Sequence, residues 1–303
     1  MRILYIAHHR PGDWDEGAGI SYAFEQLGHT VVRIPERSIR PTDMHHVRGD
    51  MLLFHHFSFL PFIAEARRVR PKVFWYFDLV DFPDPTLTVR CMARKLWMEQ
   101  AVQVADIGFM NDGDWVNKDL TGKLHVLHEG ADERFLGKGD ATAYVAPARI
   151  VFVGSPNGGT KRMSCIGELQ ARYGAKFIGI GAAERHRVYQ RDLANVLANV
   201  DITVAPDSPV TANYWSNRVY LMTAFGKFLI HPYCGNLDYW DGHEIVYYRS
   251  REELFAKIDW FLEQPEAREK IAAGGLKATT ERHTYRHRLT KMLEIVEKWK
   301  TTQ

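Results

Sequence analysis

The polar segment Ser216-Asn217-Arg218 carries the residues best suited to binding an anion. An apolar run follows it and closes at Gly226, and a second short apolar run then begins, a pattern typical of a helix followed by a strand. The first N–H groups of a helix lack intrahelical acceptors and its dipole makes this end positive, so Arg218 adds to an existing attraction for anions. A glycine-containing turn at 234–238 is a second loop of this kind. The two loops together predict a diphosphate site.

A glycine-rich loop at 154–162 makes the same prediction earlier in the chain. It follows an expected strand and leads into an expected helix, with Lys161 and Arg162 at the helix start. Such loops are weak signals on their own, and the alternative is a surface loop with solvated charges. Its position at the carboxyl end of a domain's first strand favours the binding site. The Gly179-x-Gly181 pair lacks a third glycine, so a dinucleotide-binding fingerprint is not expected.

The first half of the chain offers polar side chains that could activate an acceptor hydroxyl. The carboxyl ends of the strands line the crevice of a doubly wound domain, and a general base must lie within hydrogen-bond reach of its proton. We rank two residues of an aspartate-rich loop, Asp81 and Asp78, above His56 and His9. The alternative for each strand-end histidine is a structural role with its hydrogen bonds satisfied.

One carboxylate pair, Asp112 and Asp114, has the D-x-D spacing that can hold a divalent cation beside a diphosphate. The pair lies in the half of the chain that should bind the acceptor, and Asp112 fits equally well as the cap of a short helix. We therefore expect no metal site and no tightly bound cofactor. Basic residues and helix dipoles should neutralise the diphosphate instead.

The apolar pattern predicts two series of strands and helices to position these residues. The expected strands of the first half are 3–7, 31–34, 51–56, 73–78, 107–111 and 125–128, and its expected helices include 18–27, 60–69 and 87–104. The expected strands of the second half are 150–153, 177–180, 202–205, 228–230 and 245–248. This alternation predicts an α/β fold of two Rossmann-like doubly wound domains facing a cleft.

Composition and length fit two full domains. The 303 residues are enough for two domains of about 150 residues each, and a content of 46% hydrophobic and 12% aromatic residues supports full cores. The net charge is only +2. No apolar run approaches the ~18 residues of a membrane span, and Met1 leads directly into a strand, so we expect a soluble cytoplasmic protein. The three cysteines lie far apart without a C-x-x-C, which argues against a disulfide framework or a structural zinc.

An ordered series of motifs over roughly 149–296 resembles the C-terminal domain of group-1-like glycosyltransferases, especially the spore-maturation-protein branch. The series runs S-N-R-V-Y-x-x-x-A-x-G-x-F-L-I, G-x-L, D-G-x-E-I-V-x-Y, Q-P-E-x-R-x-K-I-A-x-x-G and H-T-Y-R-x-R. Its order is more specific than any one motif. The resemblance implies a GT-B fold and Leloir-type transfer of a sugar from a nucleoside diphosphate to an acceptor hydroxyl. It implies an acceptor domain at 1–140, a donor domain at 141–284, and a last helix at 285–303 that packs back toward the first domain.

In the resembling enzymes the glycine-rich loop contacts the donor phosphates. The donor-binding residues implied here are Gly154, Ser155, Lys161, Arg162, Asn213, Tyr214, Ser216, Asn217, Arg218, Gly235, Asn236 and Leu237. Many of these enzymes hold the sugar and ribose with a Glu-x7-Glu pair, and the corresponding positions here are Asn213 and Leu221. Asn213 or Asn217 would have to replace that pair. The expected co-substrate is a nucleoside-diphosphate sugar, with a UDP-sugar first.

The acceptor is expected to be a small molecule or a glycan, and three different readings of the function stay open. The first is a DNA glycosyltransferase acting on hydroxymethylated pyrimidines, in which basic clusters follow the phosphate backbone and aromatic side chains contact an extruded base. The residues concerned are Arg67, Arg68, Arg70, Lys72, Arg90, Arg94 and Lys95, with Trp75, Phe82 and Trp97. Such charge runs are also typical of solvated helix faces. The second is a nucleotide-sugar-binding protein without catalysis, and the third is an epimerase of the same fold.

Overall fold

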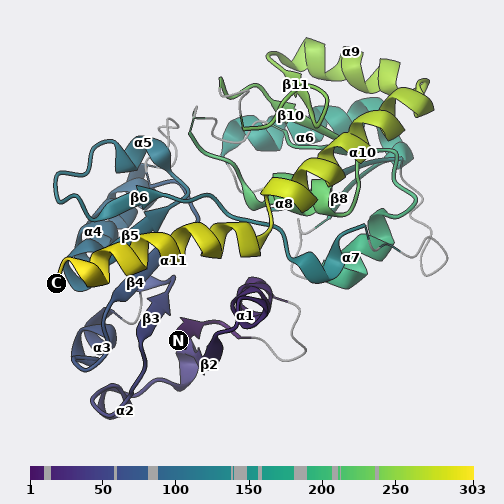
Figure 1. The fold of residues 1–303 in the computed structure, drawn as a ribbon. Coiled ribbons are helices and arrows are strands. Elements are labelled where there is room, and N and C mark those ends of the chain that lie inside the picture. The colour runs from purple at the N-terminus through teal and green to yellow at the C-terminus, as the bar shows by residue number, and fades with distance from the viewer. Residues whose placement is uncertain are drawn as a thin grey trace.

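The protein folds into two α/β domains, each built on its own parallel sheet (Figure 1). The computed structural model describes residues 1–9, 15–57, 60–80, 88–137, 139, 149–155, 159–180, 190–206, 211, 213–235 and 239–303. Two apolar cores flank each sheet, because successive strand residues point to opposite faces: Ile3 and Tyr5 belong to one core, and Leu4 and Ile6 to the other. The predicted fold class is confirmed, and burial on both faces explains why the strands read as continuous apolar runs.

The first sheet has six parallel strands in the order β2-β1-β3-β4-β5-β6. The strands are β1 (Arg2–Ala7), β2 (Thr30–Pro35), β3 (Met51–Phe54), β4 (Lys72–Tyr76), β5 (Ile107–Met110) and β6 (Leu124–Val126). The connecting helices are α1 (Glu16–Gln26), η1 (Glu36–Ser38), α2 (Pro41–Met44), α3 (Leu60–Glu65), α4 (Thr88–Val104), α5 (Gly113–Val116) and η4 (Glu133–Phe135).

The second sheet has five parallel strands in the order β11-β10-β9-β7-β8. The strands are β7 (Ile150–Val153), β8 (Phe177–Ile180), β9 (Ile202–Val204), β10 (Leu229–Pro232) and β11 (Val246–Tyr248). The helices are α6 (Thr160–Tyr173), η5 (Gly174–Lys176), α7 (Gln190–Leu197), α8 (Asn217–Ala224), α9 (Arg251–Leu262) and α10 (Pro265–Arg282). Within the described part of the chain, none of the helices has the length and hydrophobicity that crossing a bilayer requires.

Both sheets reverse their strand order at one point, between β1 and β3 in the first sheet and between β7 and β9 in the second. Crossovers leave in opposite directions on either side of such a point, which opens a crevice at the carboxyl ends of the two strands. The segments that follow these four strands are therefore where bound ligands are expected.

The last helix, α11 (Tyr285–Thr301), leaves the second domain and lies along the first, as the yellow ribbon in Figure 1 shows. The Thr284 side chain caps it by accepting from the backbone N–H of His287. Four buried residues of α11 join the core formed by β1, β3 and α1: Tyr285, Leu289, Met292 and Val296. The chain thus passes between the domains twice.

The two passages of the chain between the domains are hydrogen-bonded to each other. The Ala131 N–H donates to the carbonyl of His283 at 2.8 Å, and the Tyr285 N–H donates to the carbonyl of Ala131 at 2.9 Å. A Cβ on Gly130 would lie 2.7 Å from the carbonyl carbon of Thr284, so only glycine lets the two backbones approach this closely.

We expect Leu289→Ala to lower the free energy of unfolding by about 2–5 kcal/mol, because this side chain is fully buried between α11 and the first sheet. Urea denaturation followed by circular dichroism measures the change. The control, Lys291→Ala, lies on the exposed side of the same helix and should stay within about 0.5 kcal/mol of the parent. Equal unfolding midpoints for the two variants would contradict this packing of α11.

Candidate active site

The first turn of α8 lies against the carboxyl end of β7. Arg218 donates from Nε to the carbonyl of Val153 at 2.5 Å, and its guanidinium lies 4.8 Å from the ring centroid of Phe152. Gly154 follows with a φ of 141°, and a Cβ there would lie 2.4 Å from Nη2 of Arg218. Glycine at this position therefore lets the guanidinium lie directly against the strand end.

The positive charge of Arg218 lacks a counterion among the described residues. Nη1 of Arg218 and Oγ of Ser216 are both buried without a hydrogen-bond partner in that part of the chain. Burial, and then the neighbouring Arg162, lower the pKa of Arg218 to about 9. A buried cation beside a second cation is costly unless an anion accompanies it. The arrangement suits a phosphate group that would accept hydrogen bonds from both side chains.

The start of α6 completes this cluster. Nη1 of Arg162 donates to the carbonyl of Ser155 at 3.1 Å, so the described contacts join Gly154, Ser155, Arg162 and Arg218. The neighbouring Lys161 is exposed. Gly235 has a φ of 87° in the turn after β10. The predicted Asn236 and Leu237 lie outside the described residues.

The two asparagines predicted to replace the glutamate pair instead connect the domains. Nδ2 of Asn217 donates to Oε1 of Glu16, at the start of α1, at 2.5 Å. Nδ2 of Asn213 donates to Oδ1 of Asp114 at 2.7 Å. Both amides therefore bind carboxylates of the first domain in this structure, and a ribose would have to displace one of them.

Three carboxylates of the first domain gather opposite α8. The pKa of Glu16 is raised by burial and then by Asp78. The pKa of Glu129 is raised well above its usual range by burial, Glu16 and Asp78, and its Oε2 has no hydrogen-bond partner in the described part of the chain. Burial, and then Asp78 and Glu129, raise the pKa of the Tyr214 hydroxyl well above its usual range, so this side chain feels the same carboxylates. Neighbouring like charges favour the protonated forms, so the cluster can hold a proton near the cationic site.

The comparisons with known proteins identify the family and the fold of the chain. Residues 145–294 match the family described as glycosyl transferase-like, a match that takes in the second sheet and the first part of α11. The chain belongs to the group-1-like glycosyltransferases. No curated protein sequence matches it significantly.

Solved structures share the fold of this glycosyltransferase over its whole length. Sucrose-phosphate synthase from Thermosynechococcus elongatus aligns with a TM-score of 0.69 and 12% identity, covering 100% of both chains. Anabaena HepE in complex with UDP and glucose aligns with a TM-score of 0.67 and 14% identity, covering 98% of this chain and 99% of that one. The catalytic domain of starch synthase IV from Arabidopsis thaliana, bound to ADP and acarbose, aligns with a TM-score of 0.62 and 10% identity. This alignment covers 98% of this chain and 99% of that one. At these identities the likeness establishes the fold, which is GT-B.

The predicted catalytic residues of this glycosyltransferase occupy different settings. Asp78 lies at the carboxylate cluster, where its side chain is 59% exposed and pairs with Nη2 of Arg94 at 2.9 Å. His56 hydrogen-bonds to the buried Glu36. His9 donates through Nε2 to the carbonyl of Tyr5 at 2.9 Å, which fits the structural alternative. Asp81 lies outside the described residues and stays a prediction.

Glu16 and Glu129 were missed from the sequence. An acidic residue in the first turn of a helix usually serves the helix dipole, so nothing local marks Glu16. Glu129 directly follows the strand expected at 125–128, and the same strand-end rule that selected Asp78 could have found it.

The D-x-D aspartates of the glycosyltransferase are held by protein donors. Asp112 caps α5, because Oδ1 accepts from the N–H of Trp115 at 3.1 Å and Oδ2 from that of Val80 at 3.0 Å. Asp114 accepts from Asn213. The interpretation of Asp112 as a cap is confirmed.

Several residues proposed to contact DNA lie in the interior. Arg94 is buried and pairs with Asp78, and Lys72 is buried and donates to the carbonyl of Ala64 at 3.3 Å. Trp75 is fully buried, and its Nε1 donates to the carbonyl of Leu127 at 3.0 Å. The prediction that Arg94 and Lys72 follow a phosphate backbone, or that Trp75 stacks on a base, is therefore wrong. Other side chains of this set are described as well. Arg67 and Arg70 each form an ion pair, and Arg68 is exposed. Lys95 is half-buried, and Trp97 is 46% exposed.

Proposed function

We propose that this glycosyltransferase moves a sugar from a nucleoside-diphosphate sugar, a UDP-sugar first, to a hydroxyl of a small molecule or a glycan. The proposal rests on the uncompensated donors at the β7 end, Nη1 of Arg218 and Oγ of Ser216. UDP in the HepE complex supports a uridine nucleotide, and ADP on starch synthase IV makes an ADP-sugar the second choice. The spore-maturation branch stays a prediction.

The cationic cluster would stabilise the leaving diphosphate. Negative charge grows on the diphosphate oxygen as its bond to the anomeric carbon breaks, and preorganised donors act most strongly where charge develops. We assign this role to Arg162 and Arg218, with Ser216 and the start of α8.

The carboxylates opposite would take the proton of the acceptor. As the acceptor oxygen bonds to the anomeric carbon, its proton passes to a carboxylate, and we assign that role first to Glu16 and second to Asp78. Glu16 is hydrogen-bonded to Asn217, the residue before Arg218, so the proton acceptor and the leaving-group donors lie close together. Its raised pKa brings its proton affinity nearer to the neutral range in which a general base works best.

A small molecule or a glycan fits the acceptor side better than DNA does. Tracking a duplex requires several exposed cations, and Arg94 and Lys72 are buried. Hydroxymethylated duplex DNA is therefore the second candidate to test.

The deciding experiment is incubation with UDP-, ADP-, GDP- and dTDP-sugars, with and without acceptors. We expect nucleoside diphosphate to be released faster with an acceptor present, together with an acceptor product heavier by one sugar. A binding protein without catalysis would be stabilised by UDP but would release no nucleoside diphosphate from the sugars. An epimerase would release nucleoside diphosphate without any acceptor. If no nucleoside diphosphate raised the melting temperature at saturating concentration, the donor site itself would be wrong.

A further inference from the structure

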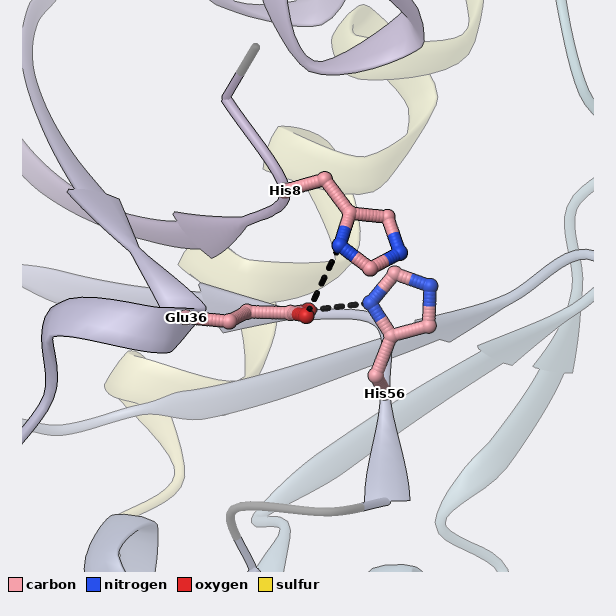
Figure 2. A group of neighbouring side chains, drawn as sticks. All are labelled: His8, Glu36 and His56. Carbon is pink, nitrogen blue, oxygen red and sulfur yellow. Dashed lines mark hydrogen bonds and ion pairs between the residues drawn. The ribbon is translucent and has the colours of Figure 1, made fainter.

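Three side chains of the first domain converge at the carboxyl edge of its sheet: His8, Glu36 and His56 (Figure 2). His8 follows β1, Glu36 opens η1 directly after β2, and His56 follows β3. The strand order β2-β1-β3 makes these three strands neighbours, so their ends bring the side chains together. The two histidines flank the point where the strand order reverses, where doubly wound sheets bind ligands.

The three side chains present their polar atoms to one another. Nδ1 of His8 lies 3.2 Å from Oε2 of Glu36, and Nδ1 of His56 hydrogen-bonds to Oε1. Figure 2 shows both nitrogens turned toward the carboxylate. One ligand atom from each residue lies within 4.8 Å of the others, and the two imidazole centroids are 4.4 Å apart. Two imidazole nitrogens and a carboxylate oxygen are a common donor set for transition metals.

Burial and charge favour a cation here. The side chain of Glu36 is only 4% exposed, and its described partners are the two histidines. A divalent cation bound to the same atoms would neutralise this buried carboxylate directly. His8 and His56 are 51% and 42% exposed, so the site is open to solvent on the side of the rings.

We propose that His8, Glu36 and His56 bind one divalent transition-metal ion, with Zn²⁺ as the best fit. Imidazole ligands suit zinc and its neighbours, whereas Mg²⁺ and Ca²⁺ prefer sites built of oxygen ligands. Each histidine would bind the ion through a deprotonated Nδ1, and three protein ligands would leave a fourth position for water or a substrate oxygen.

This metal site is separate from the diphosphate site, which lies in the other domain, and it departs from the expectation of no metal drawn from the sequence. His56 is close enough to Glu16 to lower its pKa, so the ion would lie on the side of the first domain that we assign to the acceptor. Binding of the ion does not depend on the proposed sugar transfer.

The test is calorimetric titration of the full chain with ZnCl₂ after removal of metal by a chelator and dialysis. We expect one Zn²⁺ per chain, with affinity lowered about tenfold or more by His8→Ala and by Glu36→Gln. His45→Ala is the matched control, because His45 faces Glu65 at 3.7 Å at the surface and has no part in the cluster. Co²⁺ in place of Zn²⁺ should give visible d–d absorption in the parent and the control, and lose it in both ligand variants.

His8→Ala keeps the test valid if the buried Glu36→Gln variant folds poorly, because His8 is half exposed. Circular dichroism and the melting temperature establish which variants are folded. Absence of stoichiometric Zn²⁺ binding by the parent, or equal binding by the parent and folded His8→Ala, would reduce the three residues to a hydrogen-bonded cluster. UDP-induced stabilisation, measured on the same samples, should persist in every folded variant, so that failure of the donor site is recognised separately.

Discussion

Arg218→Met is expected to lower kcat by about 10²–10³-fold, the loss typical of removing one preorganised donor from developing negative charge. Methionine keeps much of the length and apolar contact of the side chain while removing the guanidinium. The melting temperature without nucleotide should change little, because the lost Nε hydrogen bond to the Val153 carbonyl is offset by removal of a buried cation that has no counterion among the described residues. The stabilisation that UDP gives the parent should be largely lost. Turnover with the preferred donor and thermal melting with and without UDP measure both effects.

Arg172→Met is the matched control for this prediction. Arg172 is another cation of α6, but it lies at the other end of that helix. Its side chain is half exposed and forms an ion pair with Asp259. Its substitution should leave turnover and the response to UDP near parental values. Arg162→Ala, at the start of α6, should lower both turnover and donor affinity. Turnover within twofold of the parent in both Arg218→Met and Arg162→Ala would remove the diphosphate from this site.

Glu16→Gln is expected to lower kcat by about 10²–10⁴-fold, the usual contribution of a general base, while donor affinity stays within a few-fold of the parent. Glu16 must be deprotonated to accept a proton, and burial raises its pKa. As the pH decreases, the rate of the parent should therefore begin to fall at a higher pH than it would with a glutamate of ordinary pKa. This acid limb should disappear in Glu16→Gln.

Glu25→Gln, an exposed position on the same helix, is the control for charge and fold. Asp78→Asn compares the second candidate under the same conditions. A large loss in Asp78→Asn with full activity in Glu16→Gln would transfer the proton-accepting role to Asp78. Full activity in both would move it to Asp81 or His56.

Local pattern predicted most of the sheet architecture. The strands expected at 150–153 and 177–180 have these bounds in the structure, and the first of them is a continuous apolar run buried on both faces of the sheet. The strand expected at 51–56 ends at Phe54, since His55 turns its Nδ1 to the carbonyl of Trp75 at 2.6 Å. The helix expected at 60–69 ends at Glu65, and a turn at Arg67 and Arg68 follows it before Pro71.

The site could be predicted only where its chemistry is local. Ser216 and Arg218 predict an anion site because both lie at the start of one helix. Asn217 and Glu16 are separated by 201 residues, and only the packing of the two domains brings them together. Glu36 has no pattern of its own, and its partners His8 and His56 come from two other strands.

The first domain is discontinuous along the chain, because α11 completes its core after the whole second domain has intervened. The second domain is thus placed like an insertion between two parts of the first. A chimera meant to replace the first domain must exchange residues 285–303 together with the N-terminal segment. Replacing the N-terminal segment alone would press Leu289 and Met292 against a foreign surface. For the same reason, a tag or fusion partner joined after Gln303 would be attached to the first domain rather than to the second.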